Sequence, residues 1–259
     1  NKQCPFVAIP VFPSRAFRHG FIAIHRKAGI KVPKDLEGRR VGVPLLTMTA
    51  AIYINGLLQH EYGVDLRKIR WVQGAMNTGG AHGSPTVLPL LDPIPIEQNS
   101  SNKSMSDLLE ERSVDATLGT SLPEAIRTNP DVVRLFPNYV ELEKEFYKRT
   151  RIYPIMHLMV VRRELIDKRP ALGRELLGLF EAAKRLAYEF YDDSNYSLLV
   201  DGRTYVERER ADFGADPWPN GFAANKLNLE RFIGYAHDQR LIEAPFPAER
   251  LFHPSTLET

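Results

Sequence analysis

Short apolar runs alternate with segments of helical periodicity along this chain, and this alternation limits the fold more than any other feature. The apolar runs, which suit buried strands, are Val7–Val11, Phe21–His25, Arg39–Pro44, Ile69–Gly74 and Tyr153–Arg163. The segments with helical spacing are 45–63, 138–150, 167–193 and 225–242, and the segment 105–119 predicts a short helix followed by a strand that ends at Gly119. Such alternation predicts an α/β fold with mostly parallel sheets. Ligands of these folds bind beyond the carboxyl ends of strands, often at helix N-termini.

The ends of two predicted helices carry recognisable signals. Pro170 falls in the first turn of the longest helical segment, where its missing N–H costs nothing. Thr47 or Thr49 is expected to cap the helix of 45–63, and Gly63 is expected just past its end.

Composition excludes several classes of protein. The 259 residues are 43% hydrophobic, which is ordinary for a globular chain of one or two domains. The net charge is only +2, from 34 basic and 32 acidic residues, and no basic block occurs. Nucleic acid is therefore not an expected partner, and any cationic site has to be local.

Cysteine and histidine spacing limit the chemistry further. Cys4 is the only cysteine, so an internal disulfide and a cysteine-rich zinc site are excluded. No histidine pair has the HxxxH spacing of a metal site, and we assign no metal ligand. The charge-free stretch Val41–Gln59 contains Pro44, Asn55 and Gly56, so it predicts a strand, loop and helix rather than a membrane span.

The first candidate site is the segment Pro10–Gly20, which we expect to be a loop between two strands. It holds Ser14, Arg15, Arg18 and His19 close together. Guanidinium groups bind planar carboxylates through paired hydrogen bonds. The alternative is a surface loop with solvated arginines, and spacing alone favours that alternative.

The second candidate site is the predicted helix start at Thr47 and Thr49. Unpaired N–H groups and two hydroxyls at a helix N-terminus suit an anion. Ordinary capping without any ligand explains the same residues equally well.

The third candidate site precedes and includes His157. This histidine lies in a run otherwise typical of a core strand, where a hydrogen-bonded core role is the more frequent one. Arg151 and Tyr153 come just before it and favour a polar site at the strand end. A neutral histidine there is suited to proton transfer near pH 7.

Seven segments together resemble the 4,5-dihydroxyphthalate decarboxylase family. They are "FVAIPVFPSRAFRHG", "DLEGRRVGVP", "MTAAIYINGLLQHEYGVD", "IRWVQG", "RLFPNY", "PIMHLMVVRR" and "WPNGFAANKLNLERF". They occur in the family's order and span nearly the whole chain, so the combination is more specific than any single motif.

The resemblance implies a two-lobed fold like that of type II periplasmic-binding proteins, with mixed, mostly parallel sheets and a cleft between the lobes. Lobe 1 would comprise 1–19 and 151–259, and lobe 2 would comprise 20–150. Family members carry several tens of residues before the segment that matches "FVAIP". We therefore expect the first part of lobe 1 to be missing from this sequence.

The resemblance also implies an activity in aromatic catabolism, the removal of one carboxylate from 4,5-dihydroxyphthalate to give protocatechuate and CO2. His157 would be the leading proton-transfer residue and His19 the second. The remaining site residues would bind the small aromatic dicarboxylate: Ser14, Arg15, Arg18, Thr47, Thr49, Arg151 and Tyr153. The chemistry requires no cofactor, and the sequence does not decide whether a divalent metal assists. It also does not decide whether the protein forms a homo-oligomer.

The main alternative is a solute-binding protein of an ABC-type transporter for an aromatic or other organic anion. That role would place the protein in the periplasm, whereas the enzyme would be cytoplasmic. Arginines and aromatic residues in a cleft serve either role. Fold alone does not decide between them.

Overall fold

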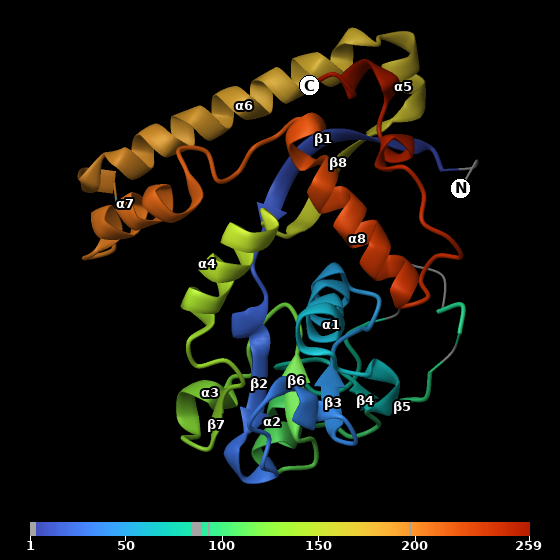
Figure 1. Cartoon of the computed structure of the whole chain (residues 1–259), viewed down its shortest axis with the longest axis vertical. Coiled ribbons are helices and arrows are strands. Elements are labelled where there is room, and N and C mark those ends of the chain that lie inside the picture. Colours follow the sequence, from blue (N-terminus) through green and yellow to red (C-terminus); the bar gives the residue numbers. More distant parts are fainter. Residues whose placement is uncertain (1–3, 84–89, 93, 197) are drawn as a thin grey trace. The chain divides into compact units, whose positions relative to one another are not determined.

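The structure is a computed structural model that describes residues 4–83, 90–92, 94–196 and 198–259. The chain forms two compact units, shown together in Figure 1. Unit 1 comprises 1–16, 144–231 and 246–259, and unit 2 comprises 17–143 and 232–245. The sequence places lobe boundaries at 19/20 and 150/151, and those lobes and their cleft stay a prediction. Each unit is described by itself.

Unit 2 contains a mixed six-stranded sheet with the strand order β5-β4-β3-β6-β2-β7. Its strands are β2 (Ile22–His25), β3 (Arg40–Val43), β4 (Arg70–Gln73), β5 (Ile96–Gln98), β6 (Ala116–Leu118) and β7 (Val132–Arg134). The pairs of β3 with β4, β4 with β5 and β3 with β6 are parallel. Strand β2 pairs antiparallel with both of its neighbours, β6 and β7. The predicted α/β class with mostly parallel pairing is confirmed.

Successive apolar side chains along the strands of unit 2 point to opposite sides, so both faces of the sheet are apolar. Ile22 and Ile24 of β2 pack with residues of helix α1 (Thr49–Tyr62), including Ile54. Ala23, between them, faces the opposite side, where helix α2 (Met105–Glu110) contributes Met105. Successive side chains of a strand point to opposite faces, so the sheet is covered by helices on both sides.

Unit 1 contains a two-stranded antiparallel ladder of β1 (Phe6–Arg15) and β8 (Ile155–Arg162). Val7, Ile9 and Val11 of β1 form a buried cluster with Ile166. Leucines of the long helix α6 (Ala171–Asp192) cover that cluster. The register of the ladder shifts on either side of Ser14, which lies opposite His157.

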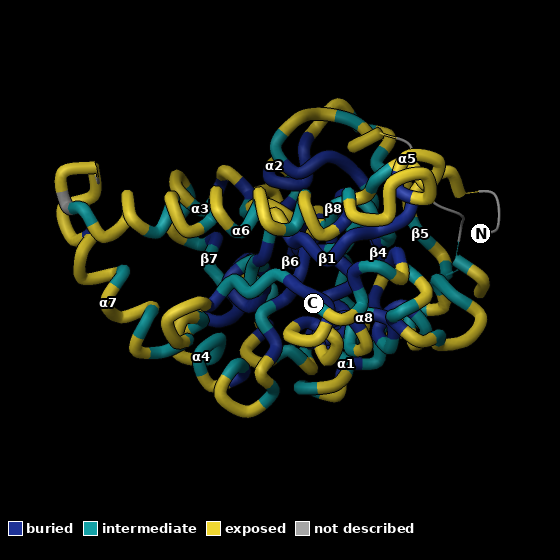
Figure 2. Tube along the Cα trace, turned by 90° about the horizontal axis from the view of Figure 1, so that it is seen from above, coloured by how far each residue is buried: buried dark blue, intermediate teal, exposed yellow. Residues whose placement is uncertain are grey.

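The remaining helices complete the two units. They are α3 (Ala125–Thr128), α4 (Tyr139–Thr150), α5 (Arg163–Lys168), α7 (Gly202–Phe213) and α8 (Lys226–Asp238). Figure 2 shows α6 and α7 as largely exposed, and Gly173 and Gly202 are the buried residues assigned to them among the described positions. Helices α4 and α8 each continue from one unit into the other.

Three expectations from the sequence are wrong. The segment Pro10–Gly20 is not all loop, because β1 continues through Ser14 and ends at Arg15. Neither Thr47 nor Thr49 caps α1, since Met48 holds the N-cap position and makes no side-chain cap bond. The strand around His157 is not a core strand throughout, because His157 is exposed and Val160 is 48% exposed.

The expectation for the end of α1 is confirmed. Gly63 closes α1 in the left-handed conformation at φ 64°, and its N–H bonds to the carbonyls of Gln59 and Leu58. The expectation for Pro170 is off by one residue, because Pro170 lies at the N-cap of α6 and not in its first turn. The fixed φ of proline still suits the helix start.

Candidate functional site

Arg18, His19 and Glu143 form a buried cluster in unit 2. Arg18 and His19 are 8% and 3% exposed and lie at the start of a 3₁₀ turn, His19–Phe21. Glu143 comes from α4, and its Oε1 lies 3.9 Å from Nδ1 of His19. The backbone N–H of Gly20 donates a 3.3 Å hydrogen bond to the same oxygen. A carboxyl group, an imidazole and a guanidinium are thus held together out of water.

Burial changes the acid strength of this cluster. Desolvation raises the pKa of Glu143 to about 7, while the N–H groups of Gly20 and His19 and the charges of Arg134 and Arg18 act in the opposite direction. Desolvation also lowers the pKa of Arg18, and the charge of Glu143 partly offsets this effect. A carboxyl group with a pKa near 7 can both donate and accept a proton at neutral pH.

Aromatic rings enclose the imidazole of His19. The Phe136 ring is 5.6 Å away at an interplanar angle of 70°, and the Tyr62 ring is 6.5 Å away at 83°. The backbone at Gly20 approaches Tyr139 so closely that a Cβ there would lie 2.7 Å from a ring carbon. Glycine at position 20 therefore lets α4 approach the turn and bring Glu143 to His19.

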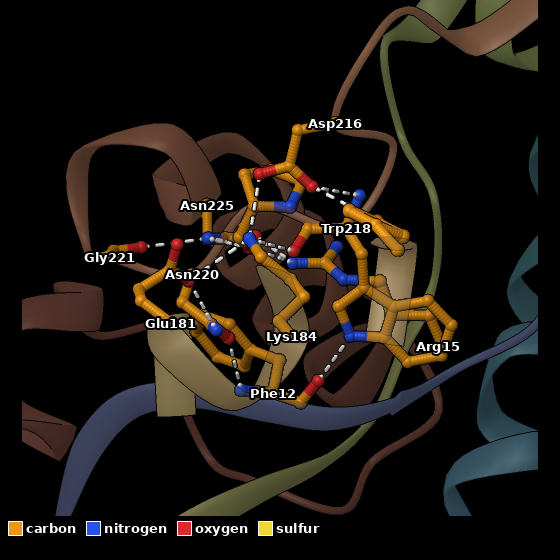
Figure 3. Close-up of polar contacts among 11 residues, drawn as sticks. Phe12, Arg15, Glu181, Lys184, Asp216, Trp218, Asn220, Gly221 and Asn225 are labelled. Carbon is orange, nitrogen blue, oxygen red and sulfur yellow. Dashed lines mark hydrogen bonds and ion pairs between the residues drawn. The ribbon is translucent and has the colours of Figure 1, made fainter. Parts of the chain in front are cut away.

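Arg15 organises a second polar cluster, in unit 1 (Figure 3). Its Nη1 donates to the carbonyl of Tyr153 at 3.1 Å, and its Nη2 donates to the carbonyl of Pro219 at 2.8 Å. Nη2 also donates to the side-chain oxygen of Asn225. The guanidinium carbon lies 5.3 Å from the centre of the Phe12 ring. Arg15 thereby fastens the end of β1 to the chain before α8.

The same cluster borders an aromatic cavity of about 780 Å³ in unit 1. Phe12, Tyr153 and Trp218 line it, together with aromatic side chains of α6 and α7. The indole N–H of Trp218 donates to the carbonyl of Phe12 at 2.6 Å. Lys184 also lines the cavity, and its ammonium lies 2.7 Å from Asp216. The lining could hold an aromatic ring, and the Lys184 ammonium within it is already paired.

The remaining residues of the predicted site lie in several places. In unit 1, Tyr153 contacts Arg15, and Ser14 lies opposite His157 across the β1–β8 ladder. Arg151 is exposed, has a φ of 58° and stacks on Tyr147 at 5.8 Å.

The predicted anion site at the start of α1 lies in unit 2. Thr49 is the first helical residue, and Thr47 lies two residues before it. Both side chains are half-buried. The structure thus brings Arg18 together with His19 in unit 2, and Arg15 together with Tyr153 in unit 1.

Sequence reasoning missed Glu143, Trp218 and Asn225. Glu143 lies in a helix so rich in charge that each carboxylate there looks solvated. The one available signal is Phe146, a buried apolar residue one turn after Glu143, which marks the packed face of α4. No local pattern indicates that Trp218 and Asn225 reach back to β1.

None of the helices in the described part of the chain has the length and apolar character needed to span a bilayer. Within residues 4–83, 90–92, 94–196 and 198–259, no three His, Cys, Asp or Glu side chains are grouped so as to hold a metal ion.

Comparison with known proteins identifies the family. A 4,5-dihydroxyphthalate decarboxylase of Comamonas testosteroni is 32% identical to this chain over 265 residues, which covers 98% of this chain and 78% of the relative. The chain belongs to the 4,5-dihydroxyphthalate decarboxylase family. A second family member, from Pseudomonas putida, is 31% identical over 145 residues, covering 56% of each chain. No protein-family model matches the sequence.

Two solved structures are more distantly similar to this chain. The periplasmic aliphatic sulphonate binding protein SsuA of Escherichia coli is 12% identical with a TM-score of 0.49, covering 100% of this chain and 76% of SsuA. The desulfurization enzyme DSZB is 15% identical with a TM-score of 0.47, covering 98% of this chain and 78% of DSZB. Neither similarity bears on what this chain binds.

Proposed function

We propose that this protein removes one carboxylate from 4,5-dihydroxyphthalate or a closely related aromatic acid, giving protocatechuate and CO2. The observation that carries the proposal is the 32% identity, across almost the whole chain, to a protein named for this activity. The buried cluster of Arg18, His19 and Glu143 supports it, because it supplies the groups that the reaction needs.

The proposed reaction needs one proton donor and one proton acceptor. Each carboxyl-bearing ring carbon of the substrate is para to a phenol. An acid protonates that carbon while a base takes the proton of the para hydroxyl, which gives a dienone intermediate. The bond between the ring carbon and the carboxylate carbon then breaks, its electron pair returns to the ring, and CO2 leaves. The phenol oxygen then regains its proton. One proton is consumed for each CO2 released.

His19 and Glu143 are the proposed proton-transfer pair. Nδ1 of His19 lies 3.9 Å from Oε1 of Glu143, and burial raises the pKa of Glu143 to about 7, so this carboxyl group can give up or take up a proton at neutral pH beside the imidazole. Arg18 is the proposed partner of a substrate carboxylate. A buried guanidinium binds a carboxylate through charge-assisted hydrogen bonds, which are stronger where water is excluded.

The other predicted binding residues keep their proposed roles, and His157 changes from the leading proton-transfer residue to the alternative. Arg15, Ser14, Tyr153 and Arg151 are proposed substrate contacts, as are the threonines at the start of α1. His157 stands as the alternative to His19 for proton transfer, and its exposed position gives it access to solvent. We assign no cofactor. We also propose a cytoplasmic location, which is the location expected for the enzyme.

The test is to mix the purified protein with 4,5-dihydroxyphthalate and follow the ultraviolet spectrum and CO2 release, with and without a chelator. Conversion to protocatechuate is the expected result, and a loss of rate with the chelator would add a metal to the site. Saturable binding without CO2 release would overturn the proposal in favour of a solute-binding protein for organic anions.

A further inference from the structure

A second cavity, of about 360 Å³, lies within unit 2 and takes no part in the proposed reaction. Its walls come from α1, from the chain around β4, from the end of α8 and from Leu90, Asp92 and Ile94. None of the residues predicted to form the functional site lines it. Its volume falls in the range of about 300–1,000 Å³ that small-molecule sites occupy.

Two acceptor oxygens without donors mark the inner wall of this cavity. Oδ1 of Asn55 and Oε1 of Gln59 are buried, and among the described residues no donor reaches either of them. Asn55 and Gln59 lie one helical turn apart on α1, so an axial rise of about 6 Å separates them on one face. Buried carbonyl oxygens without donors are costly, because they have lost their hydrogen bonds to water.

The rim of the cavity carries charged side chains that are already paired. Asp65 lies 3.1 Å from Nε of Arg67, and Asp92 lies 2.6 Å from Nε of Arg240. Asp238 lies 2.9 Å from Nε2 of His60. Each of these carboxylates already lies beside a basic partner, so the described part of the rim presents no unpaired carboxylate to a ligand. A neutral ligand fits this rim best.

The remaining lining is apolar and partly flat. Trp71 is buried, and its indole N–H donates to the carbonyl of Leu66 at 3.3 Å. The other apolar residues of the lining are Leu46, Leu66, Leu90, Ile94 and Leu241. A ring or another flat apolar body would displace water from these walls.

The walls are tied together on the side of α8. Nε2 of Gln239 donates to the carbonyl of Ile52 at 2.8 Å, which joins the end of α8 to α1. The backbone N–H of Leu91 donates to the carbonyl of Arg240 at 2.8 Å. Because hydrogen bonds hold these walls, the cavity is largely formed before a ligand enters.

We propose that this cavity binds a small neutral molecule that carries two neighbouring hydrogen-bond donors on a flat apolar body, with the donors directed at the side-chain oxygens of Asn55 and Gln59. Catechol, a benzene ring with two vicinal hydroxyls, is the simplest member of this class. Its hydroxyls donate to the two oxygens, and its ring lies against the apolar lining.

The two tryptophans of the chain make a direct test possible. Trp71 lines this cavity and Trp218 lines the aromatic cavity of unit 1, so protein labelled with ¹⁵N-tryptophan reports on both sites. The variant Trp218→Phe assigns the two indole signals. Catechol is expected to shift the Trp71 signal saturably. 1,2-Dimethoxybenzene, which keeps the ring and lacks the donors, is expected to bind about tenfold more weakly or not at all.

Substitutions test the two acceptors. Asn55→Leu and Gln59→Leu should each weaken catechol binding about tenfold, because one hydroxyl then loses its acceptor. Gln98→Leu, at an exposed position of β5, is the matched control and should leave binding unchanged. If Asn55→Leu fails to fold, catechol binding to the Gln59→Leu variant still tests the proposal, because position 59 is less buried.

Three results would overturn the proposal. They are the absence of a saturable Trp71 shift, equal affinity for catechol and its dimethyl ether, and unchanged affinity in the folded Gln59→Leu variant. None of these readouts depends on decarboxylation, so the proposed function stands or falls separately.

Discussion

Oε1 of Glu143 lies 3.9 Å from Nδ1 of His19, and both side chains are largely shielded from water. The two residues come from segments far apart in the chain, the turn after β1 and the helix α4. Burial raises the pKa of Glu143 to about 7, so its proton is exchanged near neutral pH. This pair is the centre of the proposed mechanism.

Replacing His19 with Asn should slow decarboxylation. Asparagine keeps a polar side chain but cannot take up and release a proton, so kcat is expected to fall by about 100-fold or more. The measurement is kcat at saturating 4,5-dihydroxyphthalate at pH 7. His82→Asn, in an exposed loop, is the control and should keep the wild-type kcat.

The same assay on His157→Asn separates the two predicted histidines. If His157→Asn loses turnover while a folded His19→Asn variant keeps it, the proton-transfer role belongs to His157 and the His19–Glu143 assignment is wrong.

Replacing Glu143 with Gln should change how stability depends on pH. The folded-state pKa of about 7 lies above the ordinary value of 4.5, so the folded protein holds this proton more tightly than the unfolded chain. That contribution is present below pH 4.5 and is lost as the pH rises to 7. The amide of the Glu143→Gln variant stays neutral at every pH. The variant should therefore exceed wild type by about 3 kcal/mol in unfolding free energy near pH 8, and by little near pH 4.5.

Urea unfolding at several pH values measures this difference. Glu141→Gln, in the exposed part of the same helix, is the control and should show no such trend. A difference between Glu143→Gln and wild type that stays constant from about pH 4.5 to about pH 8 would contradict the assigned pKa.

Replacing Arg18 with Met should weaken substrate binding. Methionine fills similar space against the Phe21 ring, which lies 4.8 Å from the guanidinium carbon, but it offers no donor to a carboxylate. The KM for 4,5-dihydroxyphthalate is expected to rise about tenfold or more. A folded variant with the wild-type KM would remove Arg18 from the site.

Replacing Arg15 with Lys should destabilise unit 1. Lysine cannot reproduce the fork that donates to Tyr153, Pro219 and Asn225 together, so the unfolding free energy should fall by about 2–4 kcal/mol. Arg208→Lys, an exposed position of α7, is the control and should change it by less than about 0.5 kcal/mol. A loss no larger than the control's would show that these hydrogen bonds contribute little.

The strands and helices of this chain were largely predictable, because their signals are local. The apolar run Arg39–Pro44 and the Gly63 helix end follow from short-range sterics and burial, and the structure has both. Helix α7 escaped prediction, since "GRTYVERERADF" is too charged to show an apolar face. The predicted cap of α1 was wrong because Met48, which makes no side-chain cap bond, holds the position expected for a threonine.

The site was less predictable, because its contacts are long-range. Arg15 and Arg18 looked like neighbours in one loop, yet strand β1 ends at the first and a new turn starts at the second. The partners of Arg15 lie about two hundred residues along the chain, at Pro219 and Asn225. Only the fold brings Glu143 to His19, and no spacing in the sequence encodes that approach.

The most direct test of the central claim is a single-turnover experiment with excess protein and 4,5-dihydroxyphthalate labelled with ¹³C in both carboxyl groups. We expect wild-type protein to release one labelled CO2 for each substrate consumed and to keep the second label in the product. The Glu143→Gln and His19→Asn variants should bind the substrate and release CO2 at least about 100-fold more slowly. Wild-type protein that binds the substrate and releases no CO2 would contradict the account.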